Sequence, residues 1–360
     1  MGIRKKKIAV LCNYELLPER VGGMDTFFWL FDRECKKNDI EVDWFFPNSA
    51  THGAYKSMTI KYDSDKSIES LFLENLSQTD NQYTHIITHF LELCTLFFYK
   101  VKQLSKAKII GVDHNPRPME GYPFDKRIKK RIKGLIFSRY IDLFIGVSEY
   151  TVKELIIDFG KQILSKSKVI YNGINTIEIE ARITRSIEKP TFLVASHLRY
   201  SKGIQDLIQA VALLPEPIKN DLKINIFGDG PYKLKLQSMV RDLKLDNCFD
   251  FKGSSAQLKS LYCSYDYMLQ PTYMECFSLS ILESLAANVP VITTNVGGNE
   301  EAITNNENGF IFEAKNIQQL ANLLQEVYLG NKKITANTRK LIEQRFTIDK
   351  MVNNYLNLLS

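Results

Sequence analysis

Short apolar runs alternate with helix-length segments of periodic hydrophobicity along the whole chain. An apolar run of strand length followed by an amphipathic helix is the repeating unit of parallel βαβ structure. The pattern therefore predicts an α/β fold. We expect strands at Lys7–Asn13, Glu41–Phe46, His85–His89, Lys108–Asp113 and Leu143–Val147 in the first half, and at Phe192–Ser196, Lys223–Phe227, Phe249–Lys252, Asp266–Gln270 and Val291–Asn295 in the second.

Helix-length segments lie between these strands. We expect helices at Asp25–Lys37, Leu91–Leu104, Lys126–Tyr140 and Tyr150–Phe159, and in the second half at Gly203–Leu214, Tyr232–Leu243, Ala256–Cys263 and Phe277–Ala287. No apolar run reaches the ~20 residues of a membrane span. The basic start of the chain is followed by an apolar segment that is too short for a signal peptide.

The length of the chain predicts two domains, because 360 residues exceed the ~100–200 of a usual single domain. The turn signal Asn172-Gly173 and a charged stretch that ends at a proline place the linker at Ile174–Pro190. We expect a first domain at residues 1–177 and a second at 178–344, with a helix in 345–360 returning to the first. Both domains should be doubly wound, with their carboxyl strand edges facing each other across a deep cleft where ligands bind.

The excess positive charge lies in the first half of the chain. Residues 1–177 hold 27 Lys+Arg against 21 Asp+Glu, whereas residues 178–360 hold 20 against 20. Within the first half, Lys100–Asp142 alone holds 12 basic and 4 acidic residues, which predicts a positively charged face. The six cysteines are scattered without a Cys-x-x-Cys pair, which favours reduced thiols and a cytoplasmic protein.

The most informative candidate site contains two glutamates eight residues apart, Glu275 and Glu283. Glu275 lies in a loop after an apolar strand, and Glu283 lies on the helix that this loop begins. The first turn of a helix presents unpaired N–H groups and the positive end of the helix dipole, which favour an anion such as diphosphate. The carboxylates are suited to accept hydrogen bonds from sugar hydroxyls on either side of that anion. This combination predicts a nucleotide-sugar site.

Three further strand ends in the second half carry candidate ligand-binding residues. The first places Arg199 and Lys202 in a strand-to-helix loop, where they could pair with a diphosphate and stabilise it as a leaving group. A solvated loop is the alternative. The second carries Gly228 and Gly230, which permit close approach of the backbone to a ligand but are also common in turns. The third carries Lys252, at a strand end where backbone groups could contact a base edge.

Taken together, these residues resemble the retaining glycosyltransferases of family four, the glycosyl transferases group 1, which have the GT-B fold. The family's donor domain carries an arginine and a lysine in a loop that ends in Lys-Gly, then a Gly-Asp-Gly-Pro turn, then two glutamates with seven residues between them. The matching positions in this chain are Lys202-Gly203, Gly228-Asp229-Gly230-Pro231, Glu275, Glu283, Pro290-Val291, Gly297-Gly298, Glu301 and Asn308-Gly309.

The resemblance implies a role for each matched residue. Glu283 would hold the ribose hydroxyls, Glu275 would contact the sugar ring near the reacting carbon, and Lys202 would hold the diphosphate. Backbone N–H groups of Cys276, Phe277, Ser278 and Leu279 would add to the diphosphate contact.

Two positions depart from the family pattern. The family's arginine aligns with His197, and Arg199 follows two residues later, so which of them holds the diphosphate stays open. Cys276-Phe277-Ser278 replaces a glycine-containing sequence, which narrows the allowed backbone angles, although Ser278 can cap the helix.

The first half offers two candidate contacts to the donor. Gly22-Gly23, in the loop after the first strand, resembles the family's glycine pair near the donor phosphate, although a plain turn is the alternative. His114 follows the strand Lys108–Asp113 and resembles the histidine that contacts the donor sugar, with His89 as its rival. Asp63-Ser64-Asp65 imitates a metal-binding signature but lies in a polar loop, so we expect no metal.

The segment Lys126–Arg139 predicts a basic amphipathic helix. Its apolar face contains Ile128, Ile132, Leu135 and Ile136. Such a helix can lie on anionic lipid, or it can dock on the sheet with its apolar stripe in the core. Both hold if the apolar side faces inward and the basic side faces phospholipid at the inner membrane. We expect no nucleic-acid partner, since no aromatic residues interleave the cations.

The sequence therefore predicts a retaining, metal-independent and cofactor-independent glycosyltransferase. It would move a hexose from a nucleotide diphosphate sugar, expected to be UDP-linked, to a glycan or lipid-linked glycan in cell-surface polysaccharide biosynthesis. The altered loop at Cys276–Ser278 leaves open a catalytically degenerate GT-B protein that scaffolds a glycan-assembly complex. A nucleotide-sugar epimerase of the same fold is a third interpretation.

Overall fold

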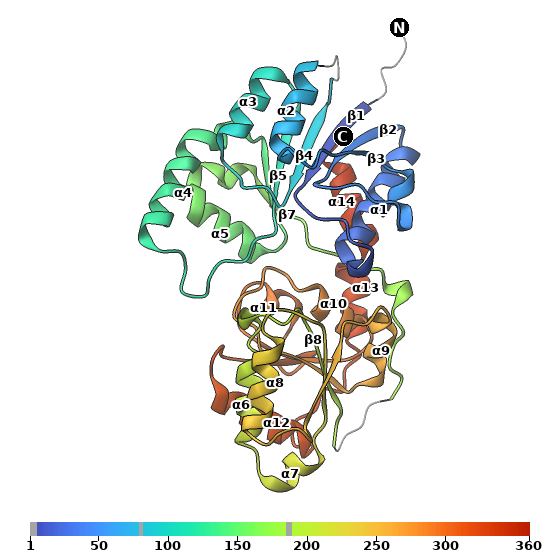
Figure 1. Ribbon diagram of the computed structural model, residues 1–360, viewed down its shortest axis with the longest axis vertical. Coiled ribbons are helices and arrows are strands. Elements are labelled where there is room, and N and C mark those ends of the chain that lie inside the picture. Colours follow the sequence, from blue (N-terminus) through green and yellow to red (C-terminus); the bar gives the residue numbers. More distant parts are fainter. Residues whose placement is uncertain (1–5, 79–81, 185–188) are drawn as a thin grey trace. The chain divides into compact units, whose positions relative to one another are not determined.

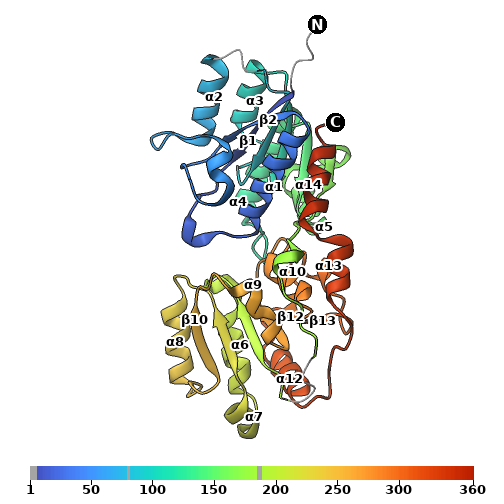
Figure 2. The same ribbon diagram turned by 90° about the vertical axis from the view of Figure 1, so that its right-hand side faces the viewer.

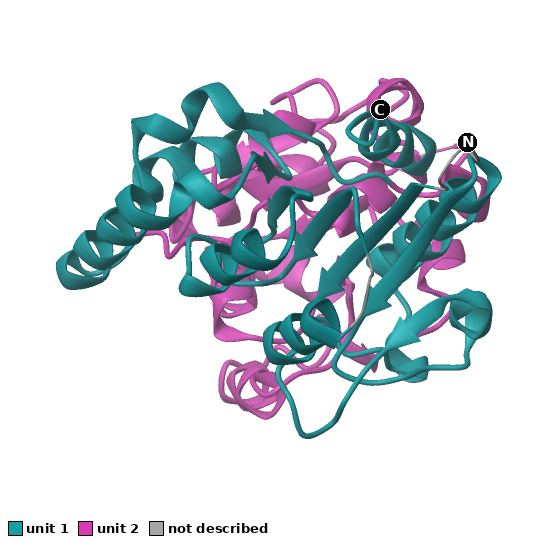
Figure 3. Cartoon of the chain, turned by 90° about the horizontal axis from the view of Figure 1, so that it is seen from above, with its two compact units in different colours: residues 1–115, 121–173, 348–360 teal, residues 116–120, 174–347 magenta. Residues whose placement is uncertain are grey.

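The structure is a computed structural model that describes residues 6–78, 82–184 and 189–360 (Figures 1 and 2). The chain divides into two compact units, which Figure 3 colours separately. The first unit contains residues 1–115, 121–173 and 348–360, and the second contains 116–120 and 174–347. Residues 185–188 of the predicted linker lie outside the described residues.

The first unit is built on a seven-stranded parallel sheet with the order β3-β2-β1-β4-β5-β6-β7. Its strands are β1 (Lys6–Cys12), β2 (Ile40–Phe45), β3 (Thr59–Lys61), β4 (His85–His89), β5 (Lys108–Asp113), β6 (Leu143–Gly146) and β7 (Ser167–Val169). Its α-helices are α1 (Gly23–Lys37), α2 (Ile68–Gln78), α3 (Leu96–Leu104), α4 (Phe124–Phe137), α5 (Glu149–Phe159) and α14 (Ile348–Asn357), and its 3-10 helices are η1 (Pro18–Arg20), η2 (Gly53–Ser57), η3 (Ser138–Tyr140) and η4 (Lys161–Lys166).

Alternate strand residues bury the two faces of this sheet against different helices. Ala9, Leu11 and Phe45 join the core formed with α2, α3 and α5. On the other face, rings of α1 and α14 pack together, and Phe27 lies with its ring centroid 5.0 Å from that of Tyr355. Because side chains of a strand alternate between faces, one seven-residue strand supports both layers.

The second unit is built on a six-stranded parallel sheet with the order β10-β9-β8-β11-β12-β13. Its strands are β8 (Phe192–Ala195), β9 (Ile224–Phe227), β10 (Phe249–Gly253), β11 (Tyr267–Gln270), β12 (Val291–Thr294) and β13 (Gly309–Phe312). Its α-helices are α6 (Ile204–Ala212), α7 (Glu216–Asp221), α8 (Lys233–Asp242), α9 (Leu258–Leu261), α10 (Leu279–Ala286), α11 (Asn299–Ala302), α12 (Ile317–Tyr328) and α13 (Arg339–Arg345), and its 3-10 helices are η5 (Thr176–Glu178), η6 (Tyr200–Lys202) and η7 (Tyr262–Ser264).

The main core of the second unit lies between the sheet and helices α6, α8 and α12. Leu207, Ile208 and Val211 of α6 are fully buried there, at the spacing expected of the buried side of a helix. On the opposite face α10 contacts β11, β12 and α13. Thus both units are sheets covered on both faces by helices, which is the predicted doubly wound architecture.

Several predicted helices are shorter than expected, for local backbone reasons. The helix predicted from Leu91 begins only at Leu96, because Cys94 has a positive φ of 57°. The helix expected within residues 345–360 is α14, which begins only at Ile348, because α13 ends at Arg345 and Phe346 and Thr347 lie between the two helices. No helix in the described parts of the chain combines the length and the apolar composition that crossing a bilayer requires.

The basic helix α4 does not bury its apolar stripe, which corrects the inward orientation considered from the sequence. Ile128, Ile132, Leu135 and Ile136 are all exposed. The buried residue of α4 is Gly134, and a Cβ atom at Gly134 would lie 2.0 Å from the carbonyl oxygen of Phe159. Close packing of this glycine on the end of α5 therefore turns the isoleucine-rich side of α4 away from the sheet.

Strand order reverses once in each sheet, between β1 and β4 and between β8 and β11. Ligands of open α/β sheets bind outside the carboxyl ends of the strands at such switch points. Residues in the loops after these four strands are therefore the natural candidates for a binding site.

Candidate functional site

The switch point of the second unit brings Lys202 and Glu275 together. Lys202 ends η6, in the loop after β8, and Glu275 lies in the loop after β11. The Nζ atom of Lys202 lies 2.7 Å from Oε2 of Glu275, and the two side chains are 23% and 16% exposed. A cation and a carboxylate that are largely but not fully shielded from water can each engage a polar ligand group, the cation a phosphate and the carboxylate a sugar hydroxyl.

Two glycines allow these loops to approach each other closely. Gly203 has a φ of 68°, and a Cβ atom there would lie 1.7 Å from the carbonyl oxygen of Pro271. Gly297, after β12, has a φ of 61°, and its Cβ atom would lie 1.7 Å from the carbonyl oxygen of Glu275. The N–H of Tyr273 also donates to the carbonyl of Ser201 at 2.8 Å. The backbone that carries Glu275 is thus held from both sides.

Helix α10 begins directly after this loop. The hydroxyl of Ser278 accepts a hydrogen bond from the N–H of Ile281 at 3.4 Å and another from the side-chain amide of Gln270 at 2.7 Å. The first N–H groups of a helix lack partners within the helix, so the start of α10 can bind an anion. The side chains of Cys276 and Phe277 are buried, which leaves their backbone as the part able to contact a ligand.

Glu283 lies one turn further along α10. Its Oε2 accepts a hydrogen bond of 3.1 Å from the hydroxyl of Tyr262. Burial raises the pKa of the Glu283 carboxyl, while the Lys259 ammonium and the Tyr262 hydrogen bond act in the opposite direction. A half-buried carboxylate with one hydroxyl donor retains capacity to accept more hydrogen bonds. Ribose hydroxyls could supply them.

The two glycines after β9 have a packing role as well as a predicted ligand role. Cβ atoms at Gly228 and Gly230 would lie 1.9 Å from the Ser196 carbonyl oxygen and 2.5 Å from that of Leu198. The loops after β8 and β9 therefore require glycine in order to pack together. Their contact with a donor stays a prediction.

The remaining predicted cations of the second unit are placed at its surface. Arg199 is exposed at the start of η6, and its N–H donates to the carbonyl of His197 at 2.9 Å. The side chains of His197 and Arg199 lie in the same loop as Lys202, so which of the two holds the diphosphate stays open. Lys252 forms an ion pair with Asp250 of its own strand, β10.

The switch point of the first unit contains Gly22 and Gly23 at the start of α1. Gly22 is the N-cap residue, and its N–H donates to Oδ2 of Asp25 at 2.8 Å. The buried Asp25 carboxylate also accepts hydrogen bonds from the hydroxyls of Tyr14 and Tyr55, at 2.9 and 2.7 Å. A carboxylate thus already occupies part of the positive end of this helix.

His114 lies at the same strand edge, after β5. Its ring stacks on Phe90 with a centroid distance of 4.3 Å, and its Nε2 lies 3.0 Å from Nδ1 of His89. Burial lowers the pKa of His114 to about 4, and burial with the nearby His114 ring lowers the pKa of His89 as well. Two neutral imidazoles at this distance share one hydrogen bond, one donating and the other accepting.

Sequence reasoning treated His89 as a rival of His114, whereas the structure pairs the two. His89 ends β4 and His114 follows β5, and these two strands are neighbours in the sheet. Their positions at adjacent strand ends could have indicated that the two rings meet. Tyr262, the partner of Glu283, was not predicted. It lies 21 residues earlier in the chain, and no motif marks it.

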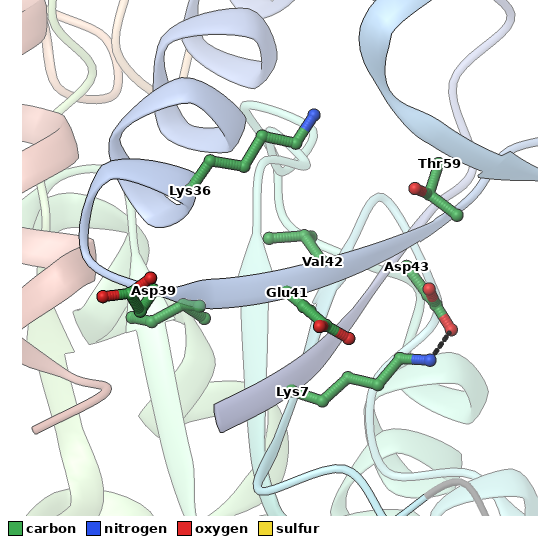
Figure 4. Close-up of a pocket in the computed structure, with 8 residues that line it drawn as sticks. Lys7, Lys36, Asp39, Glu41, Val42, Asp43 and Thr59 are labelled. Carbon is green, nitrogen blue, oxygen red and sulfur yellow. Dashed lines mark ion pairs between the residues drawn. The ribbon is translucent and has the colours of Figure 1, made fainter. Parts of the chain in front are cut away.

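A pocket of about 340 Å³ in the first unit lies away from these residues (Figure 4). Lys7, Asp39, Ile40 and Thr59 of its lining lie at the beginnings of β1, β2 and β3, the amino-terminal edge of the sheet. Its Lys7 ammonium is paired with Asp43 at 3.0 Å. The pocket thus lies at the opposite edge of the sheet from the switch point, and its Lys7 already has a carboxylate partner. We therefore do not include it in the candidate site.

No group of three or more His, Cys, Asp or Glu residues that could hold a metal ion occurs in residues 6–78, 82–184 and 189–360. The Asp63-Ser64-Asp65 sequence lies in an exposed turn in which Oδ1 of Asp63 accepts the N–H of Asp65 at 2.9 Å. Metal independence remains a prediction of the sequence.

The two doubly wound units, with candidate residues at the carboxyl edge of each sheet, define a protein of the GT-B fold. HepE of Anabaena in complex with UDP has a TM-score of 0.75 to this chain at 19% identity, and the match covers 98% of this chain and 99% of that one. At such identity the likeness shows the fold, and it confirms the predicted fold class.

Residues 176–344 match the family model of the glycosyl transferases group 1. The chain is 30% identical over 210 residues to an uncharacterized glycosyltransferase of Methanocaldococcus jannaschii, covering 54% of this chain and 53% of that protein. It is 29% identical over 226 residues to the UDP-N-acetylglucosamine–peptide N-acetylglucosaminyltransferase GtfA subunit of Streptococcus agalactiae, covering 60% and 44%. The chain thus spans about half the length of these relatives. Its second unit is a group 1 glycosyl transferase domain, which confirms the resemblance stated from the sequence.

Proposed function

We propose that the protein transfers a hexose from a UDP-sugar to a hydroxyl group of a glycan or lipid-linked glycan. The observation that carries this proposal is the Lys202–Glu275 pair, which lies at the switch point of the second sheet, in the loop that leads into α10. One ammonium and the N–H groups of a helix start provide positive potential for a diphosphate. The adjacent carboxylate provides an acceptor for sugar hydroxyls.

The names of similar proteins support UDP as the nucleotide. The Anabaena structure is a complex with UDP, and the Streptococcus agalactiae relative is named for a UDP-linked sugar. In this chain Lys202 and the start of α10 would hold the diphosphate, with Arg199 or His197 as the second cation. Glu275 would hold the sugar and Glu283 the ribose. His114, as a neutral imidazole, would contact the donor sugar from the first unit, together with Gly22 and Gly23.

The proposed transfer is retaining and needs no metal ion. The leaving diphosphate, stabilised by Lys202, would accept the proton of the incoming hydroxyl on the same face of the sugar, as the family resemblance implies. Positive charge from the protein takes the place that a divalent cation fills in other phosphate sites. The acceptor would belong to cell-surface polysaccharide biosynthesis, carried on a lipid at a membrane with which Lys126–Arg139 makes peripheral contact.

The test is nucleotide release from purified protein. UDP-glucose, UDP-galactose, UDP-N-acetylglucosamine and GDP-mannose are incubated separately with the protein, with and without a chelator, and released UDP or GDP is measured. We expect slow release from one UDP-sugar that the chelator does not reduce. Glu275→Ala and Glu283→Ala should abolish it, whereas Glu307→Ala, a change at an exposed turn of the same unit, should not.

The alternative functions give different results in the same assay. A catalytically degenerate scaffold would release no nucleotide from any donor. An epimerase would convert the sugar while its nucleotide stays attached, which chromatography of the UDP-sugars detects. Either result, or full activity in either of the two glutamate variants, would refute the proposed function.

A further inference from the structure

Helix α4 carries an exposed apolar stripe on the first unit. Phe124 is 77% exposed, Leu135 63%, Ile132 50% and Ile128 44%. At the 3.6 residues per turn of an α-helix, these four positions fall within an arc of roughly 80°. Large apolar side chains that form one continuous exposed stripe mark an interaction surface, whereas isolated ones do not.

The orientation of this stripe is set by contacts on the other side of α4. Gly134 packs against the end of α5, with no room for a Cβ atom beside the Phe159 carbonyl. Nearby, the Lys130 ammonium forms an ion pair of 3.0 Å with the buried Asp158 of α5. Figure 1 shows α4 and α5 side by side at the outside of the first sheet. These contacts hold the apolar stripe outward.

The surroundings of the stripe are strongly basic. Residues 124–137 contain six Lys or Arg residues and one acidic residue, Asp125. Arg127, Lys129 and Arg131 are exposed, and Lys129 reaches Asp125 only at 3.6 Å with both side chains mostly in solvent. A flat apolar stripe bordered by cations is complementary to a surface that is apolar inside and negatively charged outside. An anionic phospholipid bilayer has this composition.

We propose that α4 lies in the surface of a bilayer containing anionic phospholipid, with Phe124, Ile128 and Leu135 inserted below the headgroups. The adjacent cations contact the phosphates. This proposal rests on the proposed function in one respect, the suggestion that the membrane carries the lipid-linked acceptor. The loop that follows His114 leads directly into the first turn of α4, so membrane and candidate site belong to neighbouring segments of the chain.

The sequence left two orientations open, one with the helix lying on anionic lipid and one with its apolar side in the core, and a combination in which only the cations face lipid. The exposed apolar stripe favours the first of these. With the apolar side outward, binding should depend on both kinds of residue. Each exposed cation that is removed should weaken binding roughly fivefold, and loss of two large apolar side chains should weaken it by more than about tenfold.

The experiment is co-sedimentation of the full chain with vesicles of phosphatidylcholine alone or mixed with phosphatidylglycerol. We expect binding to the mixed vesicles, weakened by Phe124→Ser/Leu135→Ser and separately by Arg127→Gln/Lys129→Gln. The matched control is Leu234→Ser, since Leu234 is 79% exposed on α8 of the second unit and should not matter. The melting temperature of every variant should stay unchanged, because the replaced side chains are exposed.

Three results would overturn the proposal. One is equal binding by wild type and by the Phe124→Ser/Leu135→Ser variant. Another is binding to phosphatidylcholine alone that matches the mixed vesicles. The third is wild-type self-association, measured by analytical ultracentrifugation, that the double variant abolishes while no vesicle binding is seen, since the stripe would then contact a second copy. Nucleotide release in the absence of vesicles should be the same in wild type and double variant, so failure of the proposed function would be recognised separately.

Discussion

Gly297→Ala tests whether the loop carrying Glu275 is held in place by close backbone contact. Gly297 has a φ of 61°, and an alanine Cβ would lie 1.7 Å from the Glu275 carbonyl oxygen. Gly253 provides a matched control in the same unit. Its φ is 71°, but a Cβ atom there would have no heavy atom within 4 Å. The two substitutions therefore share a left-handed φ and differ in the space available for the new Cβ atom.

The expected costs follow from this difference. A left-handed backbone disfavours alanine by about 1–2 kcal/mol, and both variants should show this loss of unfolding free energy. Gly297→Ala should lose about 1–3 kcal/mol more, because a main-chain oxygen must move and cannot swing aside as a flexible side chain would. For a unit of this size, 1 kcal/mol corresponds to about 2–4 °C in melting temperature. Displacement of Glu275 should also reduce sugar transfer by Gly297→Ala alone.

Calorimetry and nucleotide release measure these effects, and tryptophan fluorescence gives an internal control. Trp29 and Trp44 are the two tryptophans of the chain, and both belong to the first unit. The fluorescence transition should therefore follow the first unit, and calorimetry should detect the loss in the second. If Gly297→Ala and Gly253→Ala melted together and transferred sugar equally well, the backbone contact would have no role in holding Glu275.

Three further predictions concern charged and titrating groups of the site. Lys202→Met should weaken UDP binding by roughly 10- to 100-fold in calorimetric titration, since a hydrogen bond to a charged group contributes about 1.5–3 kcal/mol. Glu275→Gln should abolish transfer yet bind UDP at least as tightly as wild type. Weaker UDP binding by Glu275→Gln would contradict the pairing of Lys202 with Glu275. Because burial raises the pKa of Glu283, this group gains a proton at a higher pH than an ordinary glutamate, so UDP affinity should begin to fall on acidification before ordinary carboxylates are protonated. Tyr262→Phe should move that fall to higher pH and Glu283→Gln should remove it, and identical profiles would exclude Glu283 as the titrating group. Burial lowers the pKa of His114 to about 4, so this residue should be neutral during catalysis. His114→Asn should therefore reduce the transfer rate but leave the shape of its pH profile at about pH 6.5, an ordinary histidine pKa, unchanged. An inflection of the wild-type profile near that pH that disappears in the variant would show that a charged His114 acts.

The elements around the donor site were predictable because their signals are local. β8 and β11 are short apolar runs, and each is followed at once by a loop with charged residues and then by a helix. In a parallel sheet, the carboxyl ends of adjacent strands meet at one edge, so Lys202 and Glu275 had to lie near each other once β8 and β11 were neighbours. That β8 and β11 are neighbours depends on the strand order of the whole sheet, which the sequence did not show and the structure does.

Contacts between helices were not predictable in the same way. The hydrophobic periodicity of α4 shows that one side of the helix is apolar, but it does not show what covers that side. The deciding contact is between Gly134 and Phe159, and a glycine carries no hydrophobic signal. The hydrogen bond from Tyr262 to Glu283 is similar, because it depends on a break in the helix predicted at Ala256–Cys263, where α9 ends and η7 begins.

The pairing of Lys202 with Glu275 implies a coupling between the two halves of a donor molecule. In the absence of ligand, each charge is compensated by the other at 2.7 Å. A diphosphate that takes the Lys202 ammonium as its partner leaves the Glu275 carboxylate partly shielded from water and without its cation, which costs free energy. Hydroxyl groups of a sugar can restore the lost hydrogen bonds, whereas UDP alone cannot. If the donor binds as proposed, wild type should therefore prefer a UDP-sugar over UDP, and this preference should shrink when the carboxylate of Glu275 is replaced by a neutral amide that has no charge to compensate.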